Sequence, residues 1–130
     1  MIIDTSALIA MLEQEPEAER IARVVAATPE RSVSAANLLE AGIVMQARRG
    51  DEGARDLDLL LAKLAVEIVP FTARQADIAR KAFRRYGRGR HGAGLNFGDC
   101  CAYALAKDES APLLFKGDDF DKTDVAIVTY

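Results

Sequence analysis

The sequence predicts an α/β fold in three layers, α/β/α, with helices on both faces of a five-stranded, mostly parallel sheet. Short apolar runs typical of buried strands recur along the chain, and segments with apolar residues at helical spacing separate them. Strands that alternate with crossover helices favour parallel pairing. The 130 residues, 50% of them apolar, suit one core, so we expect a single domain over residues 1–130.

Five apolar runs are expected to be strands. In chain order they cover residues 1–4, 31–34, 66–69, 112–115 and 125–128. The third run ends at Pro70, which cannot donate a hydrogen bond to a neighbouring strand.

Helices are expected between these strands. They cover about residues 5–12, 16–25, 35–49, 51–65, 72–86 and 99–107. Ser34 and Thr72 are placed to cap two of them, and Gly50 and Gly87 follow the last turns of two. Five glycines between residues 87 and 98 predict a mobile loop.

The composition argues against several classes of protein. No apolar run approaches the roughly 18 residues that a membrane span needs, and no basic leader precedes the first strand, so we expect a soluble, cytoplasmic protein. Cys100 and Cys101 are neighbours in sequence and cannot join distant parts of the chain, which fits a reducing compartment. With His91 as the single histidine, a zinc site is not expected.

Three isolated carboxylates indicate the chemistry. Each is the only charged residue in its stretch, which is 1–12 for Asp4, 32–47 for Glu40 and 92–106 for Asp99. A buried carboxylate costs several kcal/mol unless it is paired, hydrogen-bonded or bound to a cation. A shared metal site would account for all three.

Each carboxylate also has a simpler interpretation to be weighed. Asp4 and Asp99 precede or open helices, where Asp often serves as a cap. Glu40 lies in the second turn of its predicted helix among apolar neighbours, and no Lys or Arg of that helix is within its reach. A metal ion or a distant partner is therefore the better explanation for Glu40.

A fourth acid is expected in the loop after the fourth strand. This loop, residues 116–121, contains several Asp residues, which are often merely exposed. Asp4 and Asp118 both follow strands, however, and parallel sheets place their sites beyond the carboxyl ends of strands. The loop could therefore bring a fourth carboxylate to the other three.

Four segments carry a recognisable pattern. They are MIIDTSAL at 1–8, SAANLLE at 34–40, NFGDC at 96–100 and LLFKGDDF at 113–120. In this order they resemble PIN-domain toxins of the VapC type, which are ribonucleases of type II toxin-antitoxin systems. The resemblance spans nearly the whole chain. It implies a PIN-like fold, a magnesium-dependent endoribonuclease that hydrolyses RNA phosphodiester bonds, a small VapB-like antitoxin as partner, and a homodimer.

Position by position, the resemblance implies catalytic and metal-binding roles for four acids, and Mn²⁺ as a possible substitute for Mg²⁺. These acids are Asp4, Glu40, Asp99 and Asp118. Family members often have Thr-x-Asp before the phenylalanine, where this chain has Phe115-Lys116-Gly117, so Asp119 could hold the fourth role instead. Thr5 or Ser6 resembles the hydroxyl that steadies such a site or contacts phosphate, and Asn96 could act likewise.

The basic residues are concentrated in one region, although the net charge is −3. Arg80, Arg84 and Arg88 lie four apart, and Arg90 continues the row into the glycine-rich loop. We expect the row, with Arg84, Arg88 and Arg90 as its main contacts, to bind the RNA backbone. A solvated helix face is the alternative interpretation.

A restraining partner can be imagined from the same site. An arginine from the antitoxin would enter the acidic pocket bidentately and block substrate and metal. The apolar side chains of the first two helices could form a groove for a partner helix, although core packing is the more ordinary use. They are Leu8, Ile9, Leu12 and the side formed by residues 21–25.

Clustered carboxylates suit Mg²⁺, which can lower the pKa of a bound water and offset charge on the phosphate. In-line attack would leave a 5′-phosphate and a 3′-hydroxyl. A phosphoacceptor receiver domain or a magnesium-dependent phosphatase would need further acids at the positions of Thr5 and Ser6, and neither has use for Glu40. A non-catalytic PIN-like module that binds RNA or protein stays open as the alternative.

Overall fold

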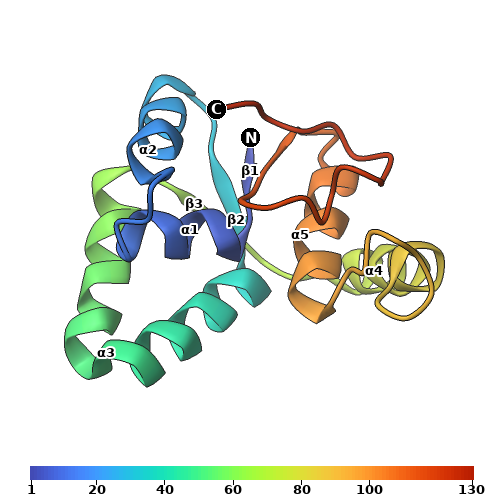
Figure 1. Cartoon of the computed structure of the whole chain (residues 1–130), viewed down its shortest axis with the longest axis horizontal. Coiled ribbons are helices and arrows are strands. Elements are labelled where there is room, and N and C mark those ends of the chain that lie inside the picture. The colour runs from blue at the N-terminus through green and yellow to red at the C-terminus, as the bar shows by residue number, and fades with distance from the viewer.

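A parallel sheet of four strands forms the middle of the molecule in the computed structural model, which describes all 130 residues (Figure 1). The strands are β1 (Ile2–Ile3), β2 (Ser32–Ser34), β3 (Glu67–Val69) and β4 (Leu113–Leu114). Their order is β3-β2-β1-β4, and every pair is parallel. The first strand of the chain is therefore central, with β2 on one side and β4 on the other.

The expected fifth strand is absent. Residues 125–128 make one isolated parallel bridge, from Ile127 to Leu113, with backbone hydrogen bonds at Ala126 and Val128. Only Val125 of this segment is buried, so the apolar run that indicated a strand lies mostly at the surface. The sheet has four strands, and the five-strand prediction was wrong.

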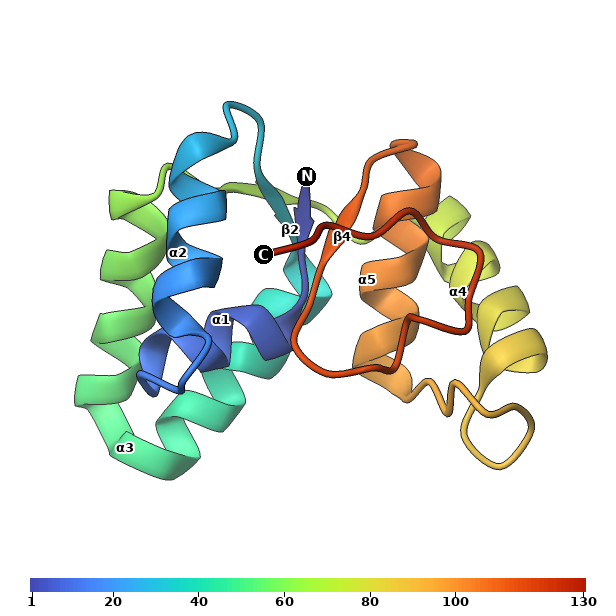
Figure 2. The same ribbon diagram turned by 45° about the horizontal axis from the view of Figure 1, so that its top comes forward.

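The helices lie on both sides of the sheet. They are α1 (Thr5–Leu12), α2 (Ala18–Ala27), α3 (Ala35–Lys63), α4 (Ala73–Tyr86) and α5 (Phe97–Asp108). Figure 2 shows α1, α2 and α3 on one side and α4 and α5 on the other. The helices predicted over 35–49 and 51–65 are the two halves of α3, separated by non-helical backbone at Gly50, whose φ of 59° a glycine adopts without strain. None of the helices is long and apolar enough to cross a membrane.

Two cores result from the alternation of side chains along the strands. Ile2 and Leu113 face a core shared with α4 and α5, while Ile3 and Leu114 face a core shared with α1, α2 and α3. The residues expected to form a groove for a partner helix belong to the second core. Leu8, Ile9, Ile21 and Val25 are buried there, and Leu12 packs against it. The more ordinary interpretation, core packing, is therefore confirmed for these residues, and they form no groove for a partner helix.

The glycine-rich segment before α5 is anchored at both ends. Gly87 and Leu95 form an isolated bridge, and Ala93 and Leu95 are buried. α5 begins at Phe97, two residues earlier than expected, because Asn96 rather than Asp99 is its N-cap. This start places Asp99 in the first turn of α5, close to the end of β1.

Candidate active site

An acidic cavity of about 360 Å³ lies at the carboxyl ends of β1 and β4. Five acids line it. Glu15 pairs with Lys116, and the other four, Asp4, Glu40, Asp99 and Asp119, take part in no ion pair. They come from the end of β1, from α3, from the first turn of α5 and from the loop after β4. Because β1 and β4 are parallel, their carboxyl ends meet at one edge, which brings these four segments together.

Asp4 uses only one of its two carboxylate oxygens for capping. Its Oδ2 accepts hydrogen bonds from the backbone N–H of Ser6 at 2.8 Å and from the Ser6 hydroxyl at 2.5 Å. Its Oδ1 is buried without a hydrogen-bond partner. Burial of the carboxyl, which is 3% exposed, raises its pKa to about 6 against the ordinary 3.8. Helix capping therefore explains the position of Oδ2 only. The buried, unpaired Oδ1 of Asp4 needs a separate explanation.

Glu40 is half-buried on α3 and has no ion-pair partner within 4.0 Å. Its carboxylate lies against Gly98 of α5 so closely that a Cβ added at Gly98 would overlap it. The negative charge of Glu40 contributes to the raised pKa values of Asp4 and Asp99. An unpaired carboxylate held among other carboxylates suits a cation site.

Asp99 both helps to cap α5 and lines the acidic cavity. Its Oδ2 accepts from the Asn96 N–H at 2.9 Å, and Asn96 Oδ1 accepts from the Asp99 N–H at 2.9 Å, which together form a capping box. Burial raises the pKa of the Asp99 carboxyl, as do the charges of Asp119 and Glu40, while Arg88 lowers it. Asn96 is exposed at the cavity wall, with its carbonyl oxygen engaged in the cap.

The acid that the loop after β4 contributes to the cavity is Asp119, not Asp118. Both residues are exposed, but only Asp119 lines the cavity and affects the pKa of Asp99. The loop is fixed at its start by a hydrogen bond from the Lys116 N–H to the Ser6 hydroxyl, at 2.9 Å, and at its end by the buried ring of Phe120. The side chain next to that buried ring is the one that reaches the other acids.

A buried amide, Asn37, was not anticipated from the sequence. Its Nδ2 donates to the Thr5 hydroxyl at 3.1 Å and to the Gly98 carbonyl at 3.0 Å, and the Thr5 hydroxyl donates to the Asn37 carbonyl at 3.3 Å. These bonds join α1, α3 and α5, the helices that follow or carry Asp4, Glu40 and Asp99. Thr5 therefore lines the cavity with its hydroxyl occupied by Asn37. The available signal was an uncharged polar residue three positions before Glu40 in an apolar stretch.

The donor set fits a hard divalent cation. All four acids offer oxygen ligands, and Asp4 Oδ1 is a buried acceptor in need of one partner. As the side chains stand, no three of the Asp, Glu, His and Cys groups are close enough together to surround one ion by themselves. A cation bound there would therefore need water molecules to complete its coordination.

The predicted arginine row lies outside the cavity. Arg84, Arg88 and Arg90 are exposed and do not line it, although Arg88 is near enough to influence the pKa of Asp99. The Arg90 guanidinium lies over the ring of Phe83, 5.9 Å from its centroid. The cations that do line the cavity are Lys116 and Arg48, which the sequence analysis did not single out.

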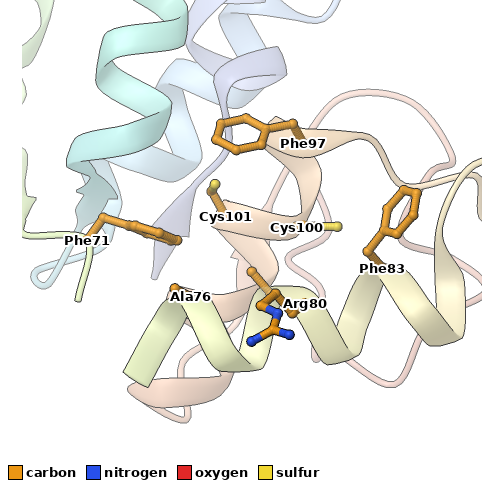
Figure 3. A pocket seen from close by; sticks show the side chains of 8 residues that line it. Phe71, Ala76, Arg80, Phe83, Phe97, Cys100 and Cys101 are labelled. Carbon is orange, nitrogen blue, oxygen red and sulfur yellow. The ribbon is translucent and has the colours of Figure 1, made fainter. Parts of the chain in front are cut away.

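An apolar groove of about 530 Å³ lies between α4 and the first turns of α5 (Figure 3). Phe71, Phe83 and Phe97 surround it, and Phe97 is 76% exposed. Cys100 and Cys101 also line it, and burial raises the pKa of both thiols to about 11. The charges of Glu40 and Asp4 also raise the pKa of Cys101.

Comparison with known proteins gives consistent results. Residues 1–126 match the PIN domain family. VapC ribonuclease Mb0640 of Mycobacterium bovis is 56% identical over 128 residues, 98% of each chain, and Ribonuclease VapC28 of Mycobacterium tuberculosis is 48% identical over 96% of this chain and 95% of its own. Among solved structures, Mycobacterium tuberculosis VapC20, a sarcin-ricin loop cleaving toxin, matches with a TM-score of 0.80 at 18% identity, covering 98% of this chain and 97% of its own. A chain of FitAcB from Neisseria gonorrhoeae matches with a TM-score of 0.71 at 23% identity, covering 98% and 96%.

Proposed function

We propose that this chain, which belongs to the PIN-domain family and is an endoribonuclease toxin of the VapC type, cleaves RNA at its acidic cavity with Mg²⁺ as cofactor. The observation that carries the proposal is the Asp4 carboxylate, whose Oδ1 is buried and unpartnered beside Glu40 and Asp99. A buried carboxylate oxygen that has no hydrogen-bond donor is stabilised best by a cation.

The residues divide the work of such a site. Asp4, Glu40, Asp99 and Asp119 would hold the cation. When bound, a divalent ion supplies positive charge to the phosphate and lowers the pKa of water near it. Ser6 orients Asp4 through Oδ2 and leaves Oδ1 free for a ligand. Arg84, Arg88 and Arg90 would contact the RNA backbone beyond the cavity, and Asn96, exposed at the cavity wall, would contact it there.

The test is cleavage of an RNA panel by the purified chain with Mg²⁺, repeated with EDTA and with Asp4→Asn and Glu40→Gln. We expect cleavage to be lost in all three. Glu52→Gln is the matched control, because Glu52 is an exposed acid of α3 outside the cavity. Circular dichroism would check that every variant folds. Binding of RNA without cleavage by the wild-type chain in Mg²⁺ would instead indicate a non-catalytic PIN-like binding module.

A small antitoxin protein is the proposed partner, as in the toxin-antitoxin complexes among the structural relatives. A second groove, of about 560 Å³, lies between the two halves of α3 and exposes Leu39 and Ile43, 65% and 61% exposed. Glu40 and Val44 of the acidic cavity follow these residues on the same helix. An antitoxin segment with an apolar helix and an arginine would cover this groove and pair with the acids.

The antitoxin proposal is tested with the protein encoded beside this chain. The measurement is how strongly that protein inhibits RNA cleavage by this chain. Ile43→Ser should weaken inhibition and leave cleavage intact. An antitoxin whose arginine is replaced by alanine should still bind and inhibit less. Equal inhibition of the wild-type chain and Ile43→Ser would exclude the groove as its binding surface.

A homodimer is proposed as well, with the groove of Phe71, Phe83 and Phe97 as its interface. The support is the exposure of three large aromatic side chains around one concave apolar surface. Light scattering on the wild-type chain and on Phe97→Ser tests it. We expect a dimer for the first and a monomer for the second, and a monomeric wild-type chain would refute it.

A further inference from the structure

We infer that Arg48 binds a phosphate of the RNA that flanks the cleaved bond, and that it is the main cationic substrate contact of the cavity itself. This inference rests on the proposed RNA cleavage at the acidic cavity. It assigns to α3 a second role in addition to the presentation of Glu40.

The position of Arg48 follows from helical spacing. Glu40, Val44 and Arg48 are four residues apart, so they share one face of α3, and all three line the acidic cavity. The rise of an α-helix separates Glu40 from Arg48 by about 12 Å along the axis. Arg48 is thus at the rim of the cavity, beyond the acids, where the RNA strand would enter or leave.

The charge balance of the cavity favours a cation at this rim. Five carboxylates line the cavity and repel an approaching phosphate chain, and the lining includes two cations to oppose them, Lys116 and Arg48. Lys116 Nζ is already paired with Glu15 and, at 3.4 Å, with Glu17. These two glutamates neutralise Lys116 and leave it unsuited to hold a phosphate.

Arg48, in contrast, takes part in no ion pair. Its neighbour in sequence, Arg49, pairs with Asp56 and, at 3.9 Å, with Glu13. The guanidinium of Arg48 is exposed and lies on the cavity side of α3, with its donors available. A planar guanidinium matches the oxygens of a phosphate bidentately, which favours RNA backbone as its ligand.

The experiment compares Arg48→Ala with Arg55→Ala on a single-stranded RNA that the wild-type chain cleaves. Arg55 is the matched control, because it is an exposed arginine of the same helix, outside the cavity and without an ion pair. We expect Arg48→Ala to raise KM roughly tenfold with kcat nearly unchanged, since a flanking phosphate is held equally in substrate and transition state. Arg48→Lys should recover part of the loss by charge alone.

Salt dependence supplies a second readout that does not need turnover. RNA binding by Asp99→Asn and by Asp99→Asn with Arg48→Ala is measured over a range of NaCl concentrations. The loss of one phosphate contact should reduce the slope of log affinity against log salt by about 1. Arg55→Ala in the same background should leave the slope unchanged.

The outcomes separate this inference from the proposed function. Wild-type cleavage with equal KM and equal salt slopes for Arg48→Ala and Arg55→Ala overturns the role of Arg48 alone. A fall of kcat at unchanged KM also overturns it, because that result would place Arg48 at the reacting group. No cleavage by the wild-type chain counts against the proposed function, and the binding slopes then decide whether Arg48 contacts RNA.

Discussion

The carboxylate of Glu40 on α3 lies against the backbone of Gly98 on α5, in a space that no other residue type at position 98 would leave open. Asn37, one turn before Glu40, donates a hydrogen bond to the Gly98 carbonyl at 3.0 Å and fixes this approach. At the contact between α3 and α5, the Glu40 carboxylate therefore fills the space that a side chain at position 98 would take. The position of an acid in the cavity depends on this contact.

Gly98→Ala should displace the Glu40 carboxylate and lower cleavage roughly 100-fold, because an added Cβ overlaps the carboxylate and a misplaced group in a site can cost that much. The fold should remain, since a flexible glutamate end can rotate away. Cleavage rates and thermal unfolding measure the two effects. Gly42→Ala is the control, because its Cβ would meet nothing nearer than 3.9 Å, and similar cleavage by both variants would contradict the prediction.

Asp4→Asn should stabilise the metal-free chain at neutral pH. The folded-state pKa of Asp4, about 6, exceeds the ordinary 3.8, so folding favours the protonated carboxyl. The stability that this proton contributes is complete below about pH 4 and is lost as the pH rises through 6. The loss amounts to roughly 2–3 kcal/mol, and the asparagine variant escapes it.

Urea unfolding in EDTA across this pH window measures the difference between the wild-type chain and Asp4→Asn. The other carboxylates are common to both proteins and largely cancel. Added Mg²⁺ should raise the stability of the wild-type chain at neutral pH far more than that of the variant. Parallel stability curves for the two proteins would mean that Asp4 is not a strained charge in the folded state.

Ser6→Ala should shift the acid limb of the pH-rate profile to higher pH. The hydrogen bonds from Ser6 lower the pKa of Asp4 and partly oppose the effect of burial, so removal of the hydroxyl raises that pKa further. The variant then needs a higher pH to obtain the same fraction of charged Asp4. The profile of kcat/KM is the measurement, and Ser6→Thr, which keeps a hydroxyl, should resemble the wild-type chain. An unshifted limb in Ser6→Ala would show that Ser6 does not tune Asp4.

Asp119→Asn should reduce cleavage and Mg²⁺ affinity roughly tenfold, while Asp118→Asn leaves both near the wild-type values. Of these two residues, only Asp119 lines the cavity. Cleavage rates and magnesium titrations of the two variants give a direct comparison between adjacent residues of one loop. A larger loss in Asp118→Asn than in Asp119→Asn would instead assign the metal-binding role to Asp118.

The sequence was informative where a charged residue stands in an otherwise apolar stretch. Asp4, Glu40 and Asp99 could be singled out because each interrupts an apolar stretch, and the structure brings all three into one cavity. The break at Gly50 and the cap at Thr72 were also predictable, since backbone freedom and side-chain capping are local properties.

Features that depend on tertiary placement could not be read in the same way. Asp118 and Asp119 are equivalent as sequence, and only the anchored ends of their loop distinguish them. Arg48 and Arg49 are likewise adjacent, and the ion pairs of Arg49 with distant acids decide which guanidinium stays available. The segment at 125–128 has the composition of a strand, but its single bridge to Leu113 shows that pairing needs a neighbouring edge over its full length.

The central position of β1 has a consequence for synthesis of the protein. Ile2 pairs with Ser32 on one side and with Leu113 on the other, so the sheet joins segments that are far apart in the chain. A growing chain on the ribosome holds Asp4 and Glu40 long before Asp99 and Asp119 exist. The acidic cavity therefore cannot form on a growing chain until the segment from Asp99 to Asp119 has been made.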